Sequence, residues 1–458
     1  MMIHKYFGGV LSAFLLGSMS LAAVYAADTS TLLDKTQNYP VDLPTVLKLV
    51  EDQSLPVASD KASDQISRSL LHQSVANILP SVEGSVLQSH LKGGSQVGGQ
   101  TLQILRDTVQ PQVTAFWTLN PGGQDVYTIL AAKRRKKEAD LQVLETLQEQ
   151  LSGAAQDYFN LLAAEANREQ VLQSIADAQE QVNLNTARLA TGVGNKLDML
   201  KSQTLLADQE QALTAADVAI STAEQALLNR LNLDSTVHLV TNPMDRGQHL
   251  LVDKAFTQTQ LIKMALEQSP AYQKSAEELK ALGIDYKAIR GQFIPSITLS
   301  TSVNGTGPQW DELHRSDSRS YTVNMNLLNN LGLNIPFQLE EKRAEIQKAV
   351  IDLKTQARSI ETQLTTAFLN SHSYETGIQS ATQDRDLAQE TYNVAFARFK
   401  AGFGTNLDVV DAATTLASAR VKLVQAVLSY NQAQVQLVQA IGQVTSNNLV
   451  HGVQANAK

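Results

Sequence analysis

The side chains most able to perform catalysis or bind a metal form no recognisable site in this 458-residue sequence. The chain has 8 histidines and 0 cysteines, and no histidine belongs to a metal-ligand spacing. No Gly-x-Ser-x-Gly elbow or phosphate loop occurs, and the Gly192-x-Gly194 pair follows a helical pattern, whereas a dinucleotide fingerprint follows a strand. The sequence therefore predicts no catalytic residue, no metal site and no cofactor, and a protein that is not an enzyme.

Three carboxylates that follow glycine-containing turns are the remaining candidates for chemistry. Asp198 comes three residues after Asn195, and Asp408 comes three residues after Thr405. An acid at the third position of a helix complements the helix dipole and the cap, so local structure explains both residues as readily as a functional role. Asp411 lies one turn further on, outside the capping position, and is harder to explain locally.

The segments around these carboxylates are two copies of one unit. Residues 187–198 (ARLATGVGNKLD) align without a gap with residues 397–408 (ARFKAGFGTNLD), at a constant offset of 397 − 187 = 210. Apolar residues then recur every seven positions in both copies, at Met199, Leu206, Leu213, Ile220 and Leu227 and at Val409, Leu416, Leu423, Tyr430 and Leu437. Sustained heptads of this kind predict antiparallel helical hairpins, which we place at 126–232 and 337–442.

Long helices are also favoured by the distribution of proline. None occurs between Pro121 and Pro243, or after Pro336, and proline is the residue that a helix interior excludes most strongly. A helix of roughly 65 residues, with a rise of about 1.5 Å per residue, gives an arm on the order of 100 Å. We therefore expect an elongated molecule.

Shorter segments with alternating polarity precede each predicted hairpin. They lie near 80–91 and 109–120 in the first copy and near 295–304 and 320–328 in the second, and the alternation is poor in the first of them. Polar loops, 92–100 and 304–317, join each pair. Short amphipathic strands are typical of an outer-membrane barrel. Four strands cannot close a barrel alone, because the outer edges would leave backbone groups unpaired in lipid, so we expect oligomerisation.

The first residues resemble a secretory signal peptide, 1–26, cleaved after Ala26. An uncleaved anchor is the alternative, but the apolar run is short and glycines interrupt it. The rest of the chain divides into a first repeat (27–248), a second repeat (249–445) and a C-terminal tail (446–458). A formal net charge of −8 argues against nucleic acid as a partner.

The order of helix, strand pair and long helical hairpin, given twice, resembles the TolC-like outer membrane efflux protein family. The most specific stretch is 399–416 (FKAGFGTNLDVVDAATTL), which is similar to the second hairpin tip of that family. The resemblance implies a mainly α fold with a β-barrel. It further implies a homotrimer that shares a twelve-stranded outer-membrane barrel, in contact with outer membrane lipid, and an α-helical tunnel extending into the periplasm.

The resemblance also implies a function and partners. The chain would be a passive duct of a tripartite efflux pump or type I secretion system, with a periplasmic adaptor protein and an inner-membrane pump or ABC exporter. The adaptor would dock at tips 190–198 and 400–408, which contain Gly192, Gly194, Leu197, Gly402, Gly404 and Leu407.

The resemblance assigns the closed tunnel mouth to acidic residues. Asp408 and Asp411 match the acids that line the mouth, and Asp198 matches the acid of the first tip. This sequence departs from the family at Gly404, where an arginine latch would otherwise lie.

Two other functions compete with the duct. A periplasmic or envelope coiled-coil structural protein would explain the signal peptide and the heptads, but not four amphipathic strands. A periplasmic adaptor would need β-rich domains after the second hairpin. The basic run 133–137 (KRRKK) has two interpretations, a solvated helical face or a contact with lipid headgroups. The sequence does not identify the exported cargo.

Overall fold

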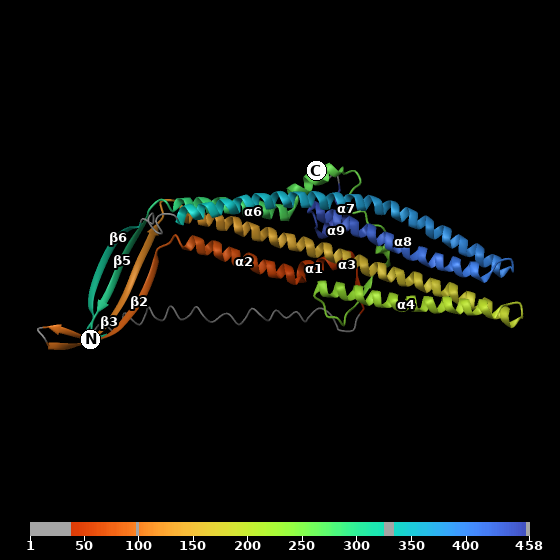
Figure 1. The fold of residues 1–458 in the computed structure, drawn as a ribbon, viewed down its shortest axis with the longest axis horizontal. Helices are drawn as coiled ribbons and strands as arrows, with labels where there is room; N and C mark the ends of the chain where they lie inside the picture. Colours follow the sequence, from red (N-terminus) through yellow and green to blue (C-terminus); the bar gives the residue numbers. More distant parts are fainter. Residues whose placement is uncertain (1–37, 98–99, 325–333, 455–458) are drawn as a thin grey trace.

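The computed structural model describes residues 38–97, 100–324 and 334–454. The predicted signal peptide, 1–26, lies outside the described residues. The molecule is elongated, with a sheet at one end and two helical hairpin tips at the other (Figure 1).

Two copies of the same series of elements build this shape. The first consists of α2 (Leu55–Ala76), β2 (Ser81–Val97), β3 (Gln100–Leu119), α3 (Gln124–Ala190) and α4 (Lys196–Leu231). The second consists of α6 (Pro270–Gly291), β5 (Ser296–Thr306), β6 (His314–Asn324), α7 (Asn334–Lys400) and α8 (Asn406–Ile441). Helices α3 and α7 both have 67 residues, and α4 and α8 both have 36. The rise of about 1.5 Å per residue makes each long helix about 100 Å.

Shorter elements surround the middle of the molecule. They are α1 (Leu43–Gln53), α5 (Gln258–Gln268), α9 (Ser446–His451), a 3-10 turn (Pro243–Arg246) and the strands β1 (Asn38–Val41) and β4 (His238–Thr241). A serine in extended conformation separates α1 from α2 at Ser54 and α5 from α6 at Ser269, and a proline follows it, two residues later at Pro56 and directly at Pro270. Because proline is tolerated in the first turn of a helix but not in its interior, each pair is broken at the same place in the repeat.

The larger sheet has the order β2-β3-β5-β6 with antiparallel neighbours, and β1 pairs in parallel with β4. Pairing between β2 and β3 continues as far as Val97 with Gln100, so the loop that the sequence suggested at 92–100 is mostly strand. Backbone pairing does not need alternating side chains, which is why the periodicity missed it. Strand β6 begins at His314 rather than near 320, and the predicted positions 325–328 lie outside the described residues.

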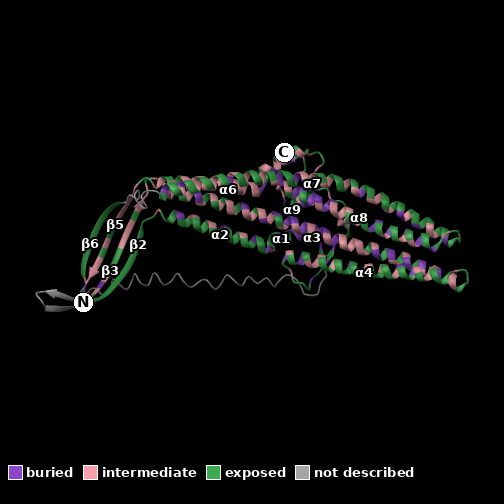
Figure 2. Ribbon diagram, viewed as in Figure 1, coloured by how far each residue is buried: buried purple, intermediate pink, exposed green. Residues whose placement is uncertain are grey.

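Burial is concentrated where the two hairpins cross the middle of the molecule (Figure 2). This equatorial core joins α1, α3, α4, α5, α7, α8 and α9 through apolar side chains that include Leu47, Leu151, Phe159, Leu161, Leu227, Leu364 and Val438. A second, smaller apolar cluster fills the second hairpin near its tip, around Tyr392, Phe399, Val409 and Leu416. The rest of each arm is thin, as the heptads predict.

Candidate functional site

The first hairpin tip is a tight turn closed by backbone hydrogen bonds. Gly192 has φ +73°, and its N–H bonds to the carbonyl of Leu189 (3.0 Å), while the Val193 N–H bonds to the carbonyl of Arg188 (3.1 Å). This is the Schellman pattern, in which a left-handed residue ends a helix at little cost when it is glycine. The side chain of Asn195 then caps α4 by accepting from the Leu197 N–H (3.0 Å).

The second tip repeats this turn and adds a complete capping box. Gly402 has φ +84°, and the Phe403 N–H bonds to the carbonyl of Arg398 (2.9 Å). Thr405 and Asp408 then exchange bonds, each side chain accepting from the other's backbone N–H (3.2 Å and 3.2 Å). The predicted cap is therefore reciprocal only at the second tip.

Close packing against the preceding helix explains why the second position of each turn is glycine. A Cβ on Gly194 would lie 2.6 Å from the backbone nitrogen of Leu189, and a Cβ on Gly404 would lie 3.0 Å from that of Phe399. Any side chain at Gly194 would thus force the turn to open, whereas Gly404 leaves slightly more room. Local packing therefore gives a reason for the glycine at 404, where the sequence departs from the family.

The three candidate carboxylates differ in environment. The hydrogen bonds from Thr405 hold the pKa of Asp408 below its ordinary value, so this exposed group stays ionised and serves as a cap. Asp411 is exposed and has no side-chain partner among the described residues. Asp198 is half-buried, and its backbone carbonyl accepts from Nδ2 of Asn406 (3.1 Å). The structure thus brings the two tips of one chain together at Asp198.

Both tips expose large apolar side chains at their ends. Val193 is 73% exposed and Phe403 is 83% exposed, and Leu197 and Leu407 are also exposed. A solvated turn at the end of a helical arm has no structural need for these side chains, and adjacent exposed apolar groups often mark a protein contact.

A buried polar cluster, which the sequence patterns did not reveal, joins the tips to each other. Nδ2 of Asn185 donates to Oγ of Ser202 (2.6 Å) and to Oδ1 of Asn406 (2.8 Å), and all three residues are buried. Nearby, Arg188 donates to the carbonyl of Phe399 (2.9 Å) and lies 4.6 Å from the centroid of its ring. We call these five residues the tip cluster.

Further up the arm the same contact between hairpins is again polar. The guanidinium of Arg420, 7% exposed, donates to Asp177 (2.9 Å), Ser174 (3.3 Å) and Gln389 (2.9 Å). Burial, followed by Asp177, raises the pKa of the adjacent Tyr392 above its ordinary range, so its hydroxyl stays neutral.

One member of this contact is left without a bond. Gln181 is 1% exposed, and both polar atoms of its side chain lack a hydrogen-bond partner among the described residues. The contact between the hairpins, from Ser174 to Arg188, is therefore largely polar and not fully bonded, although Leu184 within it packs against the apolar cluster of the second hairpin. We call this contact the tip seam.

The sheet at the opposite end has two chemically different faces. Residues paired across neighbouring strands point to the same side, so the pairing registers define the faces. One face is mainly apolar and carries Val82, Val86, Val109, Val113, Ala115, Trp117, Leu119, Ile297, Leu299, Val303, Tyr321 and Val323. The other is mainly hydroxyl and amide and carries Ser81, Ser85, Gln112, Thr114, Thr118, Thr298, Ser300, Ser302, Ser318, Ser320 and Thr322.

Hydroxyl pairs bond to each other across the polar face. Ser300 and Ser320, like Ser302 and Ser318, lie 2.6 Å apart, oxygen to oxygen. The strands thus offer one face suited to lipid and one suited to water.

The basic run near the sheet joins helices instead of facing only solvent or lipid. Arg134 and Lys137 of α3 both bind the carboxylate of Glu277 on α6 (3.1 Å and 3.3 Å), and Lys280 binds it as well (2.9 Å). Burial raises the pKa of Glu277, but the three cationic donors outweigh it and leave that pKa below its ordinary value. Neither predicted interpretation anticipated this clamp.

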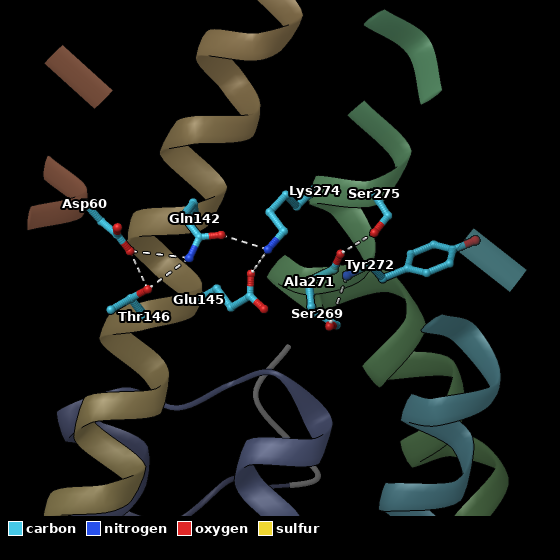
Figure 3. A network of polar contacts seen from close by, with 9 residues as sticks. All are labelled: Asp60, Gln142, Glu145, Thr146, Ser269, Ala271, Tyr272, Lys274 and Ser275. Carbon is cyan, nitrogen blue, oxygen red and sulfur yellow. Dashed lines mark hydrogen bonds and ion pairs between the residues drawn. The ribbon is translucent and has the colours of Figure 1, made fainter. Parts of the chain in front are cut away.

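A polar network continues the clamp toward the equator (Figure 3). Gln142 of α3 accepts from Lys274 of α6 (2.8 Å), and Lys274 also binds Glu145 (2.6 Å). On the other side of α3, Thr146 donates to Asp60 of α2 (2.5 Å). Three helices are thus held in one arrangement between the sheet and the equatorial core.

Among the described residues, no group of three or more potential ligand side chains is arranged to hold a metal ion. Within the same ranges, none of the helices combines the length and the apolarity that crossing a membrane demands.

Comparison with known proteins gives consistent matches. The model of the outer membrane efflux protein family matches residues 61–233 and 261–443. Outer membrane efflux protein BepC of Brucella suis biovar 1 is 22% identical over 390 residues, which cover 78% of this chain and 82% of that protein. Pyoverdine export outer membrane protein OpmQ of Pseudomonas aeruginosa is 24% identical over 342 residues, covering 71% of this chain and 67% of that protein.

Solved structures share the fold. CusC, described in work on its folding and transmembrane channel formation, superimposes with a TM-score of 0.78 at 17% identity, covering 90% of this chain and 95% of that one. The open state of the Neisseria gonorrhoeae MtrE outer membrane channel gives a TM-score of 0.75 at 17% identity, covering 90% and 91%.

Proposed function

This chain belongs to the outer membrane efflux protein family, and from that premise we propose that it is one subunit of a trimeric duct that carries cargo passively from the periplasm to the exterior. Its place is the outer membrane, with an extension into the periplasm. The observation that carries the proposal is the sheet with one apolar and one hydroxyl-lined face at the end of a helical arm about 100 Å long.

A closed barrel would require further copies of the chain. The sheet order β2-β3-β5-β6 leaves β2 and β6 as edges, and unpaired backbone groups are strongly unfavourable in lipid. Pairing of β6 with β2 of a neighbouring copy removes both edges. Three copies would give twelve strands, with the hydroxyl face toward a water-filled lumen and the apolar face toward lipid.

The tips are the proposed docking site for a periplasmic adaptor that belongs to an inner-membrane pump or ABC exporter. The exposed side chains of Val193, Leu197, Phe403 and Leu407 support this role, because apolar anchors at the end of an arm can enter grooves of a partner. The turns at Gly192, Gly194, Gly402 and Gly404 set the shape that presents them.

We place the gate at the same end of the arm. Asp411 from three copies, together with the capping Asp408, would form a ring of carboxylates that attracts cations and repels itself when ionised. Asp198, tied to Asn406 by its backbone, would hold the first tip beside the second. Opening would separate the hairpins along the tip seam, whose polar groups can exchange their bonds for water.

Assembly and conductance test the duct directly. The mature chain, extracted from outer membranes, is expected to migrate as a heat-modifiable trimer and to conduct ions in planar bilayers. In the double variant Asp408→Asn, Asp411→Asn we expect weaker block of that current by divalent cations. A soluble monomer with no conductance would instead favour an envelope coiled-coil protein.

Docking needs variants that change the surface without straining the turn. Bulky substitutions at Gly192 or Gly402 should abolish export, but their positive φ means that such changes also distort the backbone. Val193→Glu with Phe403→Glu avoids this strain, and we expect lost export and lost cross-linking to the adaptor with a normal trimer. Val218→Glu, exposed on α4, is the matched control. Full export by the tip variant would remove docking from these side chains.

The cargo and the kind of system, an efflux pump or a type I secretion system, depend on the partner pump. Genes beside this one that encode an adaptor and a proton-driven pump would indicate efflux, and an ATP-driven exporter would indicate secretion.

A further inference from the structure

Gln181 lies in the middle of the tip seam, between two bonded contacts. One helical turn toward the equator, Asp177 binds Arg420 of α8 (2.9 Å). One turn toward the tip, Asn185 binds Asn406, which is also on α8 (2.8 Å). Residues four apart lie on the same face of a helix, so Gln181 faces α8 as its two neighbours do. The bonds on either side of it hold the two helices together at this point.

The stretch of α8 between these two contacts offers Gln181 no polar partner. Its buried and half-buried side chains are all apolar, namely Val409, Val410, Ala412, Ala413, Leu416, Ala417 and Ala419. Its polar side chains are all exposed, namely Asp408, Asp411, Thr414, Thr415 and Ser418. Rotation of the Gln181 amide therefore meets no hydroxyl or carboxylate of this stretch inside the seam.

The amide of Gln181 is closed off from solvent as well as unbonded. The residue is 1% exposed, and both polar atoms of its side chain are enclosed. While the hairpins are in contact, neither water nor a neighbouring copy of the chain can therefore reach these atoms. A buried polar group without a hydrogen bond destabilises the state that buries it, because it has lost its bonds to water. Separation of the hairpins would restore those bonds.

We propose that Gln181 favours separation of the tip seam, and so lowers the free energy that adaptor docking must supply to open the gate. The inference rests on the proposed function, because it needs the seam to separate when the duct opens. Asp177 and Asn185 act in the opposite direction, since they lose hydrogen bonds within the protein when the hairpins separate. The closed seam is therefore less stable than its bonded contacts alone would make it.

Replacing the amide by an apolar group tests this effect. Gln181→Met keeps an unbranched side chain of similar length but has no amide to hydrate. In single-channel recordings of the purified trimer, we expect its ratio of open to closed time to fall about tenfold, the value of one unsatisfied buried polar group. Gln181→Leu should change this ratio in the same direction. Gln179→Met, the same change at an exposed position of α3, should match the wild type.

Separation of the seam can also be measured without any current. The chain has 0 cysteines, so Ala178→Cys, at a position of the seam that is 2% exposed, introduces a single thiol. A maleimide reagent reacts with this thiol only when the seam separates, so the rate of labelling follows the separated fraction. We expect Gln181→Met to slow the labelling about tenfold, and Gln179→Met to leave it unchanged.

Two results would overturn the proposal. Open times that are unchanged or longer in both Gln181→Met and Gln181→Leu would show that the amide does not favour opening. Slower labelling of the Ala178→Cys thiol with unchanged open times would show that separation of the seam is not what opens the gate.

The proposed function is judged on separate readouts. A wild-type trimer that does not conduct counts against the duct, and the labelling rates then still decide whether Gln181 weakens the seam. A conducting trimer in which Gln181→Met changes neither the open times nor the labelling counts only against the role of Gln181.

Discussion

The same two hairpins meet twice in this protein, and the two contacts have opposite chemistry. At the equator they share an apolar core that includes Phe159, Leu227, Leu364 and Val438. Toward the tips they meet through the tip seam and the tip cluster, which are built from amide, hydroxyl and guanidinium groups. The second hairpin nevertheless keeps an apolar interior near its tip, around Val409 and Leu416, and Leu184 of the first hairpin packs against it.

Because of this difference, we expect the hairpins to stay in contact at the equator and to be able to separate at the tips. An apolar contact loses the hydrophobic term when it opens to water. A polar contact exchanges its hydrogen bonds for bonds to water, so its net loss is much smaller. The equatorial core therefore holds the hairpins together, while the tip seam holds them only in register.

The largest effect is expected in the equatorial core. Leu227→Ala, at a position with no exposed surface, should lower stability by about 2–5 kcal/mol through lost burial and the cavity left behind. Thermal melting of the helical signal of the detergent-solubilised trimer measures this loss. Leu172→Ala, at an exposed position of α3, is the control. An equal shift in both variants would contradict the assignment of the core.

A smaller effect is expected at the upper end of the tip seam. Asp177→Ala leaves the Arg420 cation buried without its carboxylate, which should cost about 1–3 kcal/mol. The double variant Asp177→Leu, Arg420→Leu should recover most of this loss, because an apolar pair can replace a buried ion pair. Both are measured by hydrogen exchange of α8 amides near residue 420. No recovery in the double variant would mean that the seam is held mainly by its charges.

Substitutions in the tip cluster can make the contact between the hairpins at the tips apolar, like their contact at the equator. Asn185→Leu with Asn406→Leu replaces a buried bonded pair by an apolar one, and we expect a change in closed-state stability of about 1 kcal/mol or less. We also expect fewer opening events in single-channel recordings, because the contact would then lose hydrophobic burial on separation. Asn185→Leu alone leaves Ser202 and Asn406 without the hydrogen bonds from Asn185. We expect this variant to show more opening events than the wild type. Unaltered gating in the double variant would separate this cluster from the gate.

The smallest effect is expected at the tips, where the helix caps of α4 and α8 differ in their dependence on pH. Hydrogen bonding to Thr405 lowers the pKa of Asp408 in the folded chain, so this cap contributes stability above the unfolded pKa near 3.8 and loses it as pH falls through the folded value. Asn195 at the first tip does not titrate. Exchange rates corrected for intrinsic pH dependence should therefore rise below pH of about 4 at the start of α8 only. Thr405→Val should abolish the difference.

The sequence indicated the hairpins and tips because their signals are local. Glycines at 192 and 402, the capping residues and the heptads each act within a few turns of helix. The family resemblance inferred from them is confirmed by the match of the family model over both repeats. The roles assigned to Asp198, Asp408, Asp411 and the tip leucines stay predictions.

Other features could not be read from periodicity. Nothing around Asn185 marks it as the partner of Asn406, 221 residues away. The basic run could not show that Arg134 and Lys137 converge on Glu277. Strand β2 alternates poorly, yet it pairs as far as Val97, because backbone bonds extend the hairpin regardless of its side chains.

The sequence by itself thus determined the local geometry, namely long helices, their turns and amphipathic strands, because those depend on interactions between near neighbours. Only the tertiary structure decided which faces of the two hairpins meet, since that depends on how each long helix is rotated about its axis. That rotation makes the contact between hairpins apolar at the equator and polar at the tips. The tertiary structure also places β3 beside β5, which joins the two strand pairs into one sheet and puts their apolar residues on a common face.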